Sequence, residues 1–280
     1  MTFVIPATLA GASLALTRAD GALDLRVLAV VLANNLTVAY AFMVNDIEDA
    51  PDDARDPARA ARNPITCGEV APGVAWLSAL AVAAVALLCY ALSGPLAFAV
   101  GALGVALSHF YSWKPVRLKA WPVLDVISHA LMLSALLVLV GYVTYHANPG
   151  PAWLVIAGAF FGSAYGQLYN QVRDFEMDKA AGLHNTAIVA GARAARVLMY
   201  AMLVGALICG ALALLSGLVP LWLIVVGAVA LPLTLLLFRP KGDMRGGKAA
   251  DVSGKVQVQV NVYLTAMSIL WLIGVALGWG

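Results

Sequence analysis

The sequence predicts an all-α integral membrane protein with nine transmembrane helices. Of its 280 residues, 62% are hydrophobic and only 11% are charged, whereas a soluble domain carries about 25% charged residues. The apolar residues fall in long runs that are separated by short polar loops. A chain with too little charge to cover a water-facing surface is expected to face lipid instead.

Nine apolar runs approach the length of about 20 residues that a helix needs to cross a membrane. In chain order they cover residues 2–17, 26–45, 71–92, 95–112, 123–146, 151–172, 194–216, 219–238 and 257–279. The first run is short, and the fifth and ninth are long enough to tilt. Residues 1–17 have neither a basic leader nor a cleavage site, so they are interpreted as a membrane helix rather than a signal peptide. We expect one domain over residues 1–280.

The distribution of basic residues among the loops agrees with nine membrane-crossing helices. Fifteen of the 17 Lys and Arg residues fall in the alternate loops 46–70, 113–122, 173–193 and 239–256 or just inside the seventh run, at Arg196. The opposite side receives only Arg18 and Arg26. Because basic residues favour the cytoplasmic side, the pattern predicts a cytoplasmic N-terminus, an external C-terminus and an active site that faces the cytoplasm. The membrane would be the plasma membrane if the source is prokaryotic.

Other features exclude some classes of partner. The net charge is only +2, and no basic tail or interleaving of basic and aromatic residues suggests nucleic acid. Cys67, Cys89 and Cys209 lie far apart, without a CxxC pair. Membrane lipid is the partner that the composition predicts.

Two acidic stretches follow membrane runs on the predicted cytoplasmic side. The first is Asn45-Asp46-Ile47-Glu48-Asp49-Ala50-Pro51-Asp52-Asp53, and the second is Asp174-Phe175-Glu176-Met177-Asp178. On a helix, Asp46, Asp49 and Asp53 share one face with Phe42 deeper in the membrane, although Pro51 is expected to kink or end that helix. Asp174 and Asp178 continue a polar stripe that contains Gln167, Asn170 and Gln171.

Either acidic stretch alone fits a solvated helix end. Two of them on one side, each continuous with polar residues of a membrane run, indicate a function, because such residues face a bundle interior or an aqueous cavity. Mg²⁺ commonly joins one or two carboxylates to the phosphates of a substrate. Two facing carboxylate sites could therefore clamp a diphosphate and neutralise it as its carbon–oxygen bond breaks.

These residues resemble the signatures of the UbiA superfamily of intramembrane prenyltransferases. Asn45, Asp46, Asp49 and Asp53 match NDxxDxxxD, and Asp174 and Asp178 match DxxxD, followed by Ala181-Gly182 and Thr186. Residues 111–119 (Tyr-Ser-Trp-Lys-Pro-Val-Arg-Leu-Lys) are similar to the family's loop after the fourth helix, and Arg62-Asn63-Pro64-Ile65 is similar to its Arg-Arg-Pro-Leu stretch. The resemblance extends from the second predicted helix to the ninth.

The resemblance implies nine helices around a central cavity that is capped on the cytoplasmic side by the signature loops 46–70 and 173–193. It implies catalytic and Mg²⁺-binding roles for Asp46, Asp49, Asp174 and Asp178, with Asp53 as a further metal ligand. It also implies an isoprenoid diphosphate as donor and usually a lipophilic acceptor. The expected substrate contacts are Asn45, Asp53, Arg62, Lys114, Arg117, Lys119, Tyr111, Asn170, Tyr169 and Phe42.

The basic and aromatic candidates each have an ordinary alternative. Most cytoplasmic Lys and Arg residues only anchor topology. Arg117 and Lys119 are the best phosphate contacts because of the loop that carries them, although the family often has Tyr-x-x-x-Lys there and the fourth residue after Tyr111 is Pro115. Aromatic rings at Phe42, Tyr111, Tyr165 and Tyr169 could stabilise a carbocation or simply pack between helices.

Three functions remain open. A prenyltransferase would pass the ionised prenyl group to an acceptor, whereas a terpene cyclase of the same superfamily would let the donor's own double bond attack. A transporter would use a cation site, but transporters usually bind near the bilayer midplane. Family members that act on aromatic acids typically carry an Arg in the first helix, and residues 1–17 contain no basic residue. A transferase with a non-benzoate acceptor is the preferred interpretation.

Overall fold

The chain forms a helical bundle in a computed structural model that describes residues 3–18, 22–180, 182–244, 246, 249 and 251–279. The long helices are α1 (Val4–Arg18), α2 (Arg26–Asp53), α4 (Pro72–Ser93), α5 (Pro95–Ser112), α8 (Trp153–Arg173), α11 (Ala192–Leu215), α12 (Leu221–Leu237) and α13 (Val252–Ala276). A further membrane-length segment consists of α6 (Leu124–Ala130), the π-helical turn η2 (Leu131–Ala135) and α7 (Leu136–Val143). Short helices lie in the loops: α3 (Pro57–Ala60), η1 (Leu118–Ala120), η3 (Gly150–Ala152), α9 (Phe175–Ala180) and α10 (Thr186–Ala190).

Each of the nine predicted membrane runs coincides with a helical segment. Within the described ranges, six of these segments are long and apolar enough to cross a membrane. Helices α1 and α12 are apolar but contain only 15 and 17 residues, and α8 contains 21 residues with a polar stripe. The structure thus supports an integral, multi-pass membrane protein, and the crossing by all nine segments remains a prediction.

Helix α2 is longer than the predicted run 26–45, because it continues through Pro51 to Asp53. Pro51 was expected to kink or end the helix. The helix does not end there, so that part of the prediction is wrong. Pro51 is exposed and lies within three residues of the C-terminal end, so its missing N–H deprives the helix of one hydrogen bond without interrupting a longer run. Asp46, Asp49 and Asp53 therefore project from one continuous helix.

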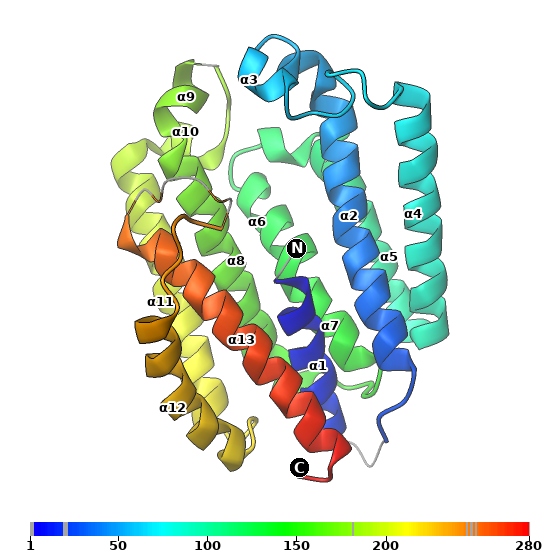
Figure 1. Cartoon of the computed structure of the whole chain (residues 1–280), viewed down its shortest axis with the longest axis vertical. Coiled ribbons are helices and arrows are strands. Elements are labelled where there is room, and N and C mark those ends of the chain that lie inside the picture. The colour runs from blue at the N-terminus through cyan, green and yellow to red at the C-terminus, as the bar shows by residue number, and fades with distance from the viewer. Residues whose placement is uncertain are drawn as a thin grey trace.

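The bundle brings the two signature loops to the same end. Figure 1 shows α3 and α9 at one end of the molecule, with α2, α4 and α5 on one side and α8, α11 and α12 on the other. Helix α2 packs against α4 and α5, and α8 packs against α11. Helix α1 packs against α7, α13 and α2 and so links the two sides.

Small residues allow α1 and α7 to approach closely. A Cβ added at Gly11 would overlap the carbonyl oxygen of Val138, and one at Gly141 would overlap the carbonyl oxygen of Thr8. Close approach of backbones through glycine is a common way for helices to associate in a membrane, where water gives no hydrophobic driving force. The contact fixes α1 against the centre of the bundle.

A buried polar cluster joins α1, α2, α4 and α7. The side-chain amide of Asn34 donates to Thr8 Oγ1 at 2.7 Å and to the carbonyl oxygen of Leu137 at 3.2 Å. The Tyr90 hydroxyl donates to Asn34 Oδ1 at 2.7 Å. These side chains have no appreciable exposure, and mutual hydrogen bonding satisfies groups that would be costly to leave unpaired in a membrane.

The predicted orientation can be tested with single-cysteine variants. One variant keeps Cys67 in loop 46–70, and the other carries Leu183→Cys in loop 173–193. Both loops are cytoplasmic in the nine-helix topology. We therefore expect both cysteines to be protected from a membrane-impermeant maleimide in intact cells. Cys67 and Leu183 are exposed, so their protection would reflect the membrane. Ala147→Cys, at an exposed position in a loop that the topology predicts to be external, is the labelled control. Labelling of Cys67 and Leu183→Cys from opposite sides would contradict a shared site.

Candidate active site

The first acidic stretch occupies the last two turns of α2. Asn45, Asp49 and Asp53 are spaced by four residues, so their side chains leave the same face of the helix. Ser112, the last residue of α5, donates its hydroxyl to Asn45 Oδ1 at 3.1 Å. The end of α5 thereby fixes the orientation of the Asn45 amide beside the acidic residues.

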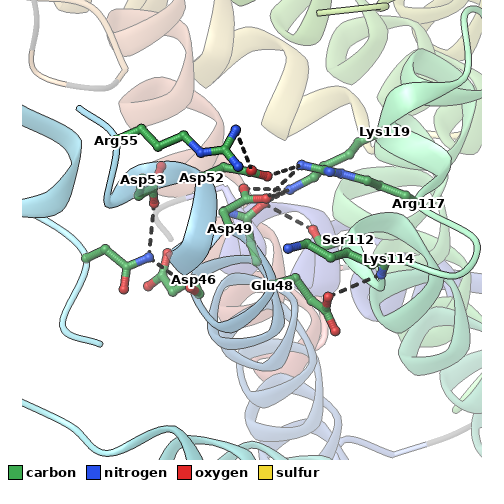
Figure 2. A network of polar contacts seen from close by, with 12 residues as sticks. Asp46, Glu48, Asp49, Asp52, Asp53, Arg55, Ser112, Lys114, Arg117 and Lys119 are labelled. Atoms are coloured by element: carbon green, nitrogen blue, oxygen red, sulfur yellow. Dashed lines mark hydrogen bonds and ion pairs between the residues drawn. The ribbon is translucent and has the colours of Figure 1, made fainter. Parts of the chain in front are cut away.

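Two cations of the loop after α5 lie on this acidic face. Lys119 Nζ donates to Asp49 Oδ2 at 2.6 Å, to Asp49 Oδ1 at 2.7 Å and to Asn45 Oδ1 at 2.9 Å. Arg117 reaches Asp49 Oδ1 at 3.3 Å and Asp52 Oδ2 at 3.1 Å with one guanidinium nitrogen. Figure 2 shows both side chains pointing from their loop toward α2. The structure thus brings together four predicted site residues: Asn45, Asp49, Arg117 and Lys119.

The Lys119 side chain is only 16% exposed. Burial lowers the pKa of its ammonium group, and the neighbouring Asp49 carboxylate opposes that shift. A buried cation of this kind requires an anionic partner, because an unpaired buried charge is strongly unfavourable. Asp49 is the partner in the present structure.

The backbone of the loop has two unusual residues. Arg117 adopts a left-handed conformation, with φ 45° and ψ 58°, and Val123 has φ 72° and ψ −47°. Lys114, another predicted contact, meets α2 through its backbone: its N–H donates to Glu48 Oε2 at 3.3 Å. Lys114 is exposed, whereas Lys119 is largely buried against Asp49.

Loop 54–71 folds back over the end of α2. The side-chain amide of Asn63 donates to the Asp46 carbonyl oxygen at 2.8 Å and to Asp53 Oδ2 at 3.0 Å. Asn63 is only 3% exposed, whereas its neighbour Arg62, a predicted substrate contact, is exposed. Asn63 therefore ties the loop to the acidic face.

The second acidic stretch begins where α8 ends. Asp174 is the C-terminal cap of α8, and its N–H donates to the Asn170 carbonyl oxygen at 3.0 Å. Arg173 forms a two-pronged ion pair with Asp174, at 2.7 and 2.9 Å, and a second pair with the buried Asp243 at 2.5 Å. Asp178 on α9 accepts a hydrogen bond from Asn185 Nδ2 at 2.9 Å.

The aromatic candidates occupy different surroundings. Tyr111 accepts a hydrogen bond from Gln167 Nε2 at 3.2 Å, and Phe42 is 47% exposed. Tyr165 and Tyr169 are buried in an apolar cluster with Met199 of α11. Their contacts with neighbouring helices are those of a packed core, and a role of either ring at the substrate stays a prediction.

Asp125 is a further site candidate that was not predicted from the sequence. This carboxylate lies in the first turn of α6, is fully buried, and accepts hydrogen bonds from Gln171 and Thr186. A usable signal was present in the sequence, since Asp125 is an acidic residue inside an apolar run, and such residues indicate a function or a specific partner.

The donor set suits Mg²⁺ that arrives together with a phosphate ligand. Within the described part of the chain, no three His, Cys, Asp or Glu side chains converge on a common metal position. Mg²⁺ typically needs only one or two carboxylates, with phosphate and water oxygens completing its shell. The carboxylates on α2 and at the end of α8 offer oxygen ligands of this type, so the residues present fit the ion.

Comparison with known proteins decides the family. The family model described as the UbiA prenyltransferase family matches residues 4–253. This chain belongs to the UbiA prenyltransferase family. The match takes in both acidic stretches and the loop with Arg117 and Lys119, so the predicted membership is confirmed.

Solved UbiA structures share the fold along nearly the whole chain. A UbiA homologue from Archaeoglobus fulgidus bound to GPP and Mg²⁺ superposes with a TM-score of 0.75 at 25% identity, over 98% of this chain and 95% of that one. A UbiA homologue from Aeropyrum pernix gives a TM-score of 0.73 at 18% identity, over 99% and 98% of the two chains.

Curated relatives match over a shorter stretch. A lycopene elongase/hydratase from Haloarcula japonica is 32% identical over 154 residues, which is 54% of this chain and 50% of that protein. The Haloferax volcanii protein of the same name is 30% identical over 159 residues, 55% of this chain and 49% of its own length. The match thus spans about half the length of these relatives.

Proposed function

We propose that this UbiA-family protein ionises an isoprenoid diphosphate in a Mg²⁺-dependent reaction and transfers the prenyl group to a lipophilic acceptor other than a benzoate. The observation that carries the proposal is the contact of Lys119 and Arg117 with Asp49 on the Asn45–Asp53 face of α2. The combination of two cationic side chains with a row of carboxylates suits a ligand that carries both phosphate and Mg²⁺.

The cations would bind the diphosphate directly. The Lys119 ammonium has three donors, and the Arg117 guanidinium offers planar pairs of N–H groups that suit phosphate oxygens. Without a ligand, Asp49 satisfies both cations. A bound diphosphate would take over as their anionic partner, and these fixed positive charges would stabilise the negative charge that develops on the leaving group.

Asp46, Asp49 and Asp53 on α2, with Asp174 and Asp178 beyond α8, would hold Mg²⁺. When bound, the ion supplies Lewis-acid neutralisation of the diphosphate oxygens. For Asp174 to serve as a ligand, its pairing with Arg173 would have to loosen. Asp243 supplies Arg173 with a second carboxylate at 2.5 Å, so the arginine would keep an anionic partner.

The signature loops would exclude water from the prenyl cation. A carbocation in contact with free water would be quenched to an alcohol, so the chemistry requires a closed site. Loops 46–70 and 173–193 are at the same end of the bundle (Figure 1), and Asn63 draws the first loop onto α2. We assign this end to the cytoplasmic side, from the distribution of basic residues.

Two indications support the proposed acceptor class. The relatives named lycopene elongase/hydratase indicate a long apolar polyene, and the described part of α1 carries no charged side chain before Arg18 that could pair with an aromatic acid. The prenyl carbon–oxygen bond of the donor would break, a bond to an acceptor carbon would form, and the acceptor would lose a proton.

The decisive experiment is product analysis of the purified protein in lipid nanodiscs. Dimethylallyl, geranyl, farnesyl and geranylgeranyl diphosphates are each supplied with Mg²⁺, with and without lycopene as the probe acceptor, and the products are identified by mass spectrometry. We expect a coupled product whose formation requires both the acceptor and Mg²⁺. A variant that lacks the charge of Asp46 (Asp46→Asn) serves as the inactive control.

Acceptor-free reactions separate the transferase from the cyclase. A transferase is expected to release at most prenyl alcohol when no acceptor is present. A cyclic hydrocarbon formed without an acceptor, at a rate equal to or above that of the coupled reaction, would replace the transferase assignment with a terpene cyclase. No Mg²⁺-dependent consumption of any of the four diphosphates would refute both assignments.

A further inference from the structure

Asp125 is a fully buried carboxylate whose two oxygens are surrounded by donors. Oδ2 accepts from Gln171 Nε2 at 2.7 Å and from the Thr186 N–H at 2.8 Å. Oδ1 accepts from the Val126 N–H at 2.8 Å and from the Thr186 hydroxyl. A carboxylate that accepts several hydrogen bonds, including two from backbone N–H groups, is held in one position.

Thr186 connects this carboxylate to the preceding loop. Its hydroxyl donates to Asp125 and accepts from the Val123 N–H at 2.7 Å. The next N–H, that of Ala187, donates to Gln171 Oε1 at 3.0 Å. Asp125, Gln171 and Thr186 thus form one closed network, which we call the 125–171–186 junction.

The junction lies between the two halves of the proposed site. Val123 ends the loop that carries Arg117 and Lys119, and Asp125 lies two residues later, in the first turn of α6. Gln171 lies one helical turn before Asp174 on α8, and Thr186 begins α10 just after Asn185, the residue that binds Asp178. The segment with the second acidic stretch is therefore held at both ends, and the cationic loop is attached to the same point.

We propose that the 125–171–186 junction positions the diphosphate-binding loop relative to the second acidic stretch, so that Asp125 and Thr186 act as positioning residues. The inference rests on the proposed function, because it assigns Arg117, Lys119, Asp174 and Asp178 to one ligand. The junction sets the spacing that lets the two halves bind the two ends of a Mg²⁺-diphosphate together.

Stability alone gives no reason for a carboxylate at this place. Burial of a charge costs several kcal/mol, and well-packed apolar residues often replace buried charged groups without loss of stability. The Val123 backbone, with φ 72°, is moreover a costly conformation for a β-branched residue. The Thr186 hydroxyl accepts the N–H of this residue, so the junction fixes the loop in a geometry that it would not adopt by itself.

The first test uses Thr186→Val, which keeps the side-chain shape and removes the hydroxyl, and Thr186→Ser, which keeps the hydroxyl. The probe is inorganic pyrophosphate with Mg²⁺, and its binding to the purified full-length protein is measured by calorimetry. We expect Thr186→Val to weaken binding by about tenfold or more, the size of effect seen when outer residues that orient ligand-binding groups are removed. Thr186→Ser should stay within about twofold of the wild type.

The matched control is Tyr90→Phe, which removes a buried hydroxyl bonded to Asn34 in the cluster of α1, α2, α4 and α7. We expect it to lower the thermal unfolding temperature without a change in pyrophosphate affinity. If Thr186→Val behaved like this control, with lower stability and wild-type affinity, the junction would be purely structural and the proposal would be wrong.

A second measurement needs neither ligand nor turnover. Spin labels at Ala120→Cys and Leu183→Cys, both at exposed positions, report the distance between the two loops in a protein whose native cysteines have been replaced. We expect the distance distribution to broaden in Thr186→Val and to be restored in Thr186→Ser. An unchanged distance distribution in Thr186→Val would contradict the positioning role of the junction. This conclusion would hold even if the substrate were not an isoprenoid diphosphate. Pyrophosphate binding without prenyl chemistry would refute only the proposed function.

Discussion

Replacement of Asp46 by asparagine is expected to lower the turnover of the isoprenoid diphosphate by about 10³-fold while the thermal unfolding temperature stays close to that of the wild type. The substitution removes a negative charge and keeps the size of the side chain. The contact that the structure records between Asp46 and loop 54–71 uses the backbone carbonyl oxygen, which binds Asn63, and it survives the change. Initial rates at saturating Mg²⁺, measured by release of diphosphate, provide the test.

Glu48→Gln is the matched control for Asp46→Asn. Glu48 lies on the same last turns of α2 and carries the same charge, but its carboxylate accepts the backbone N–H of Lys114. We expect the control to retain most of its turnover, because its side chain lies off the Asn45–Asp49–Asp53 face. Equal losses in the two variants would mean that general negative charge, rather than the Asp46 position, supports the reaction. Full turnover of Asp46→Asn would remove this residue from the site.

The second large effect is expected for Lys119→Met, which keeps the length of the side chain and removes its charge. The apparent affinity for the diphosphate should fall by about 10²-fold, because two charge-assisted hydrogen bonds to phosphate are lost. Binding of Mg²⁺ alone should change in the opposite direction, since Asp49 loses a cation that lies 2.6 Å away. Calorimetric titrations with pyrophosphate and with Mg²⁺ alone check both signs.

Lys114→Met serves as the control for Lys119→Met. Lys114 lies on the same loop, but the contact with α2 that the structure gives it comes from the backbone N–H. We expect the control to change either affinity by less than about threefold, the scale of a solvent-exposed charge. A decrease of Mg²⁺ affinity in Lys119→Met would contradict the competition between the ammonium group and the metal for Asp49.

The sequence was sufficient to locate the helices and the family. Apart from the end of α2, long apolar runs located the nine helical segments of the described residues to within about five residues, because a lipid-facing helix needs continuous apolar sequence. The end of α2 was misplaced, since Pro51 is a strong local signal against helix, whereas α2 continues through it to Asp53. The irregular turn at Leu131–Ala135 has no comparable signal, as its residues are as apolar as those of the flanking helices.

The site was only partly predictable for a physical reason. Asp49 and Lys119 are far apart along the chain, and only the family resemblance placed the loop of Lys119 near α2, where the ion pair then forms at 2.6 Å. Asp125 was missed because its meaning depends on Gln171 and Thr186, which reach it from two other segments. The pairing of Arg173 with Asp243 depends likewise on the loop before α13.

The left-handed backbone of Arg117 has a consequence for the affinity of the site. Residues with side chains that adopt positive φ angles incur a cost of about 1–3 kcal/mol, and both Arg117 and Val123 do so within one short loop. Because this cost is incurred when the protein folds, the loop meets its ligand already in shape, and ordering of the loop does not subtract from the free energy of binding. A short, preorganised loop of this kind holds Arg117 and Lys119 beside Asp49 before any ligand arrives.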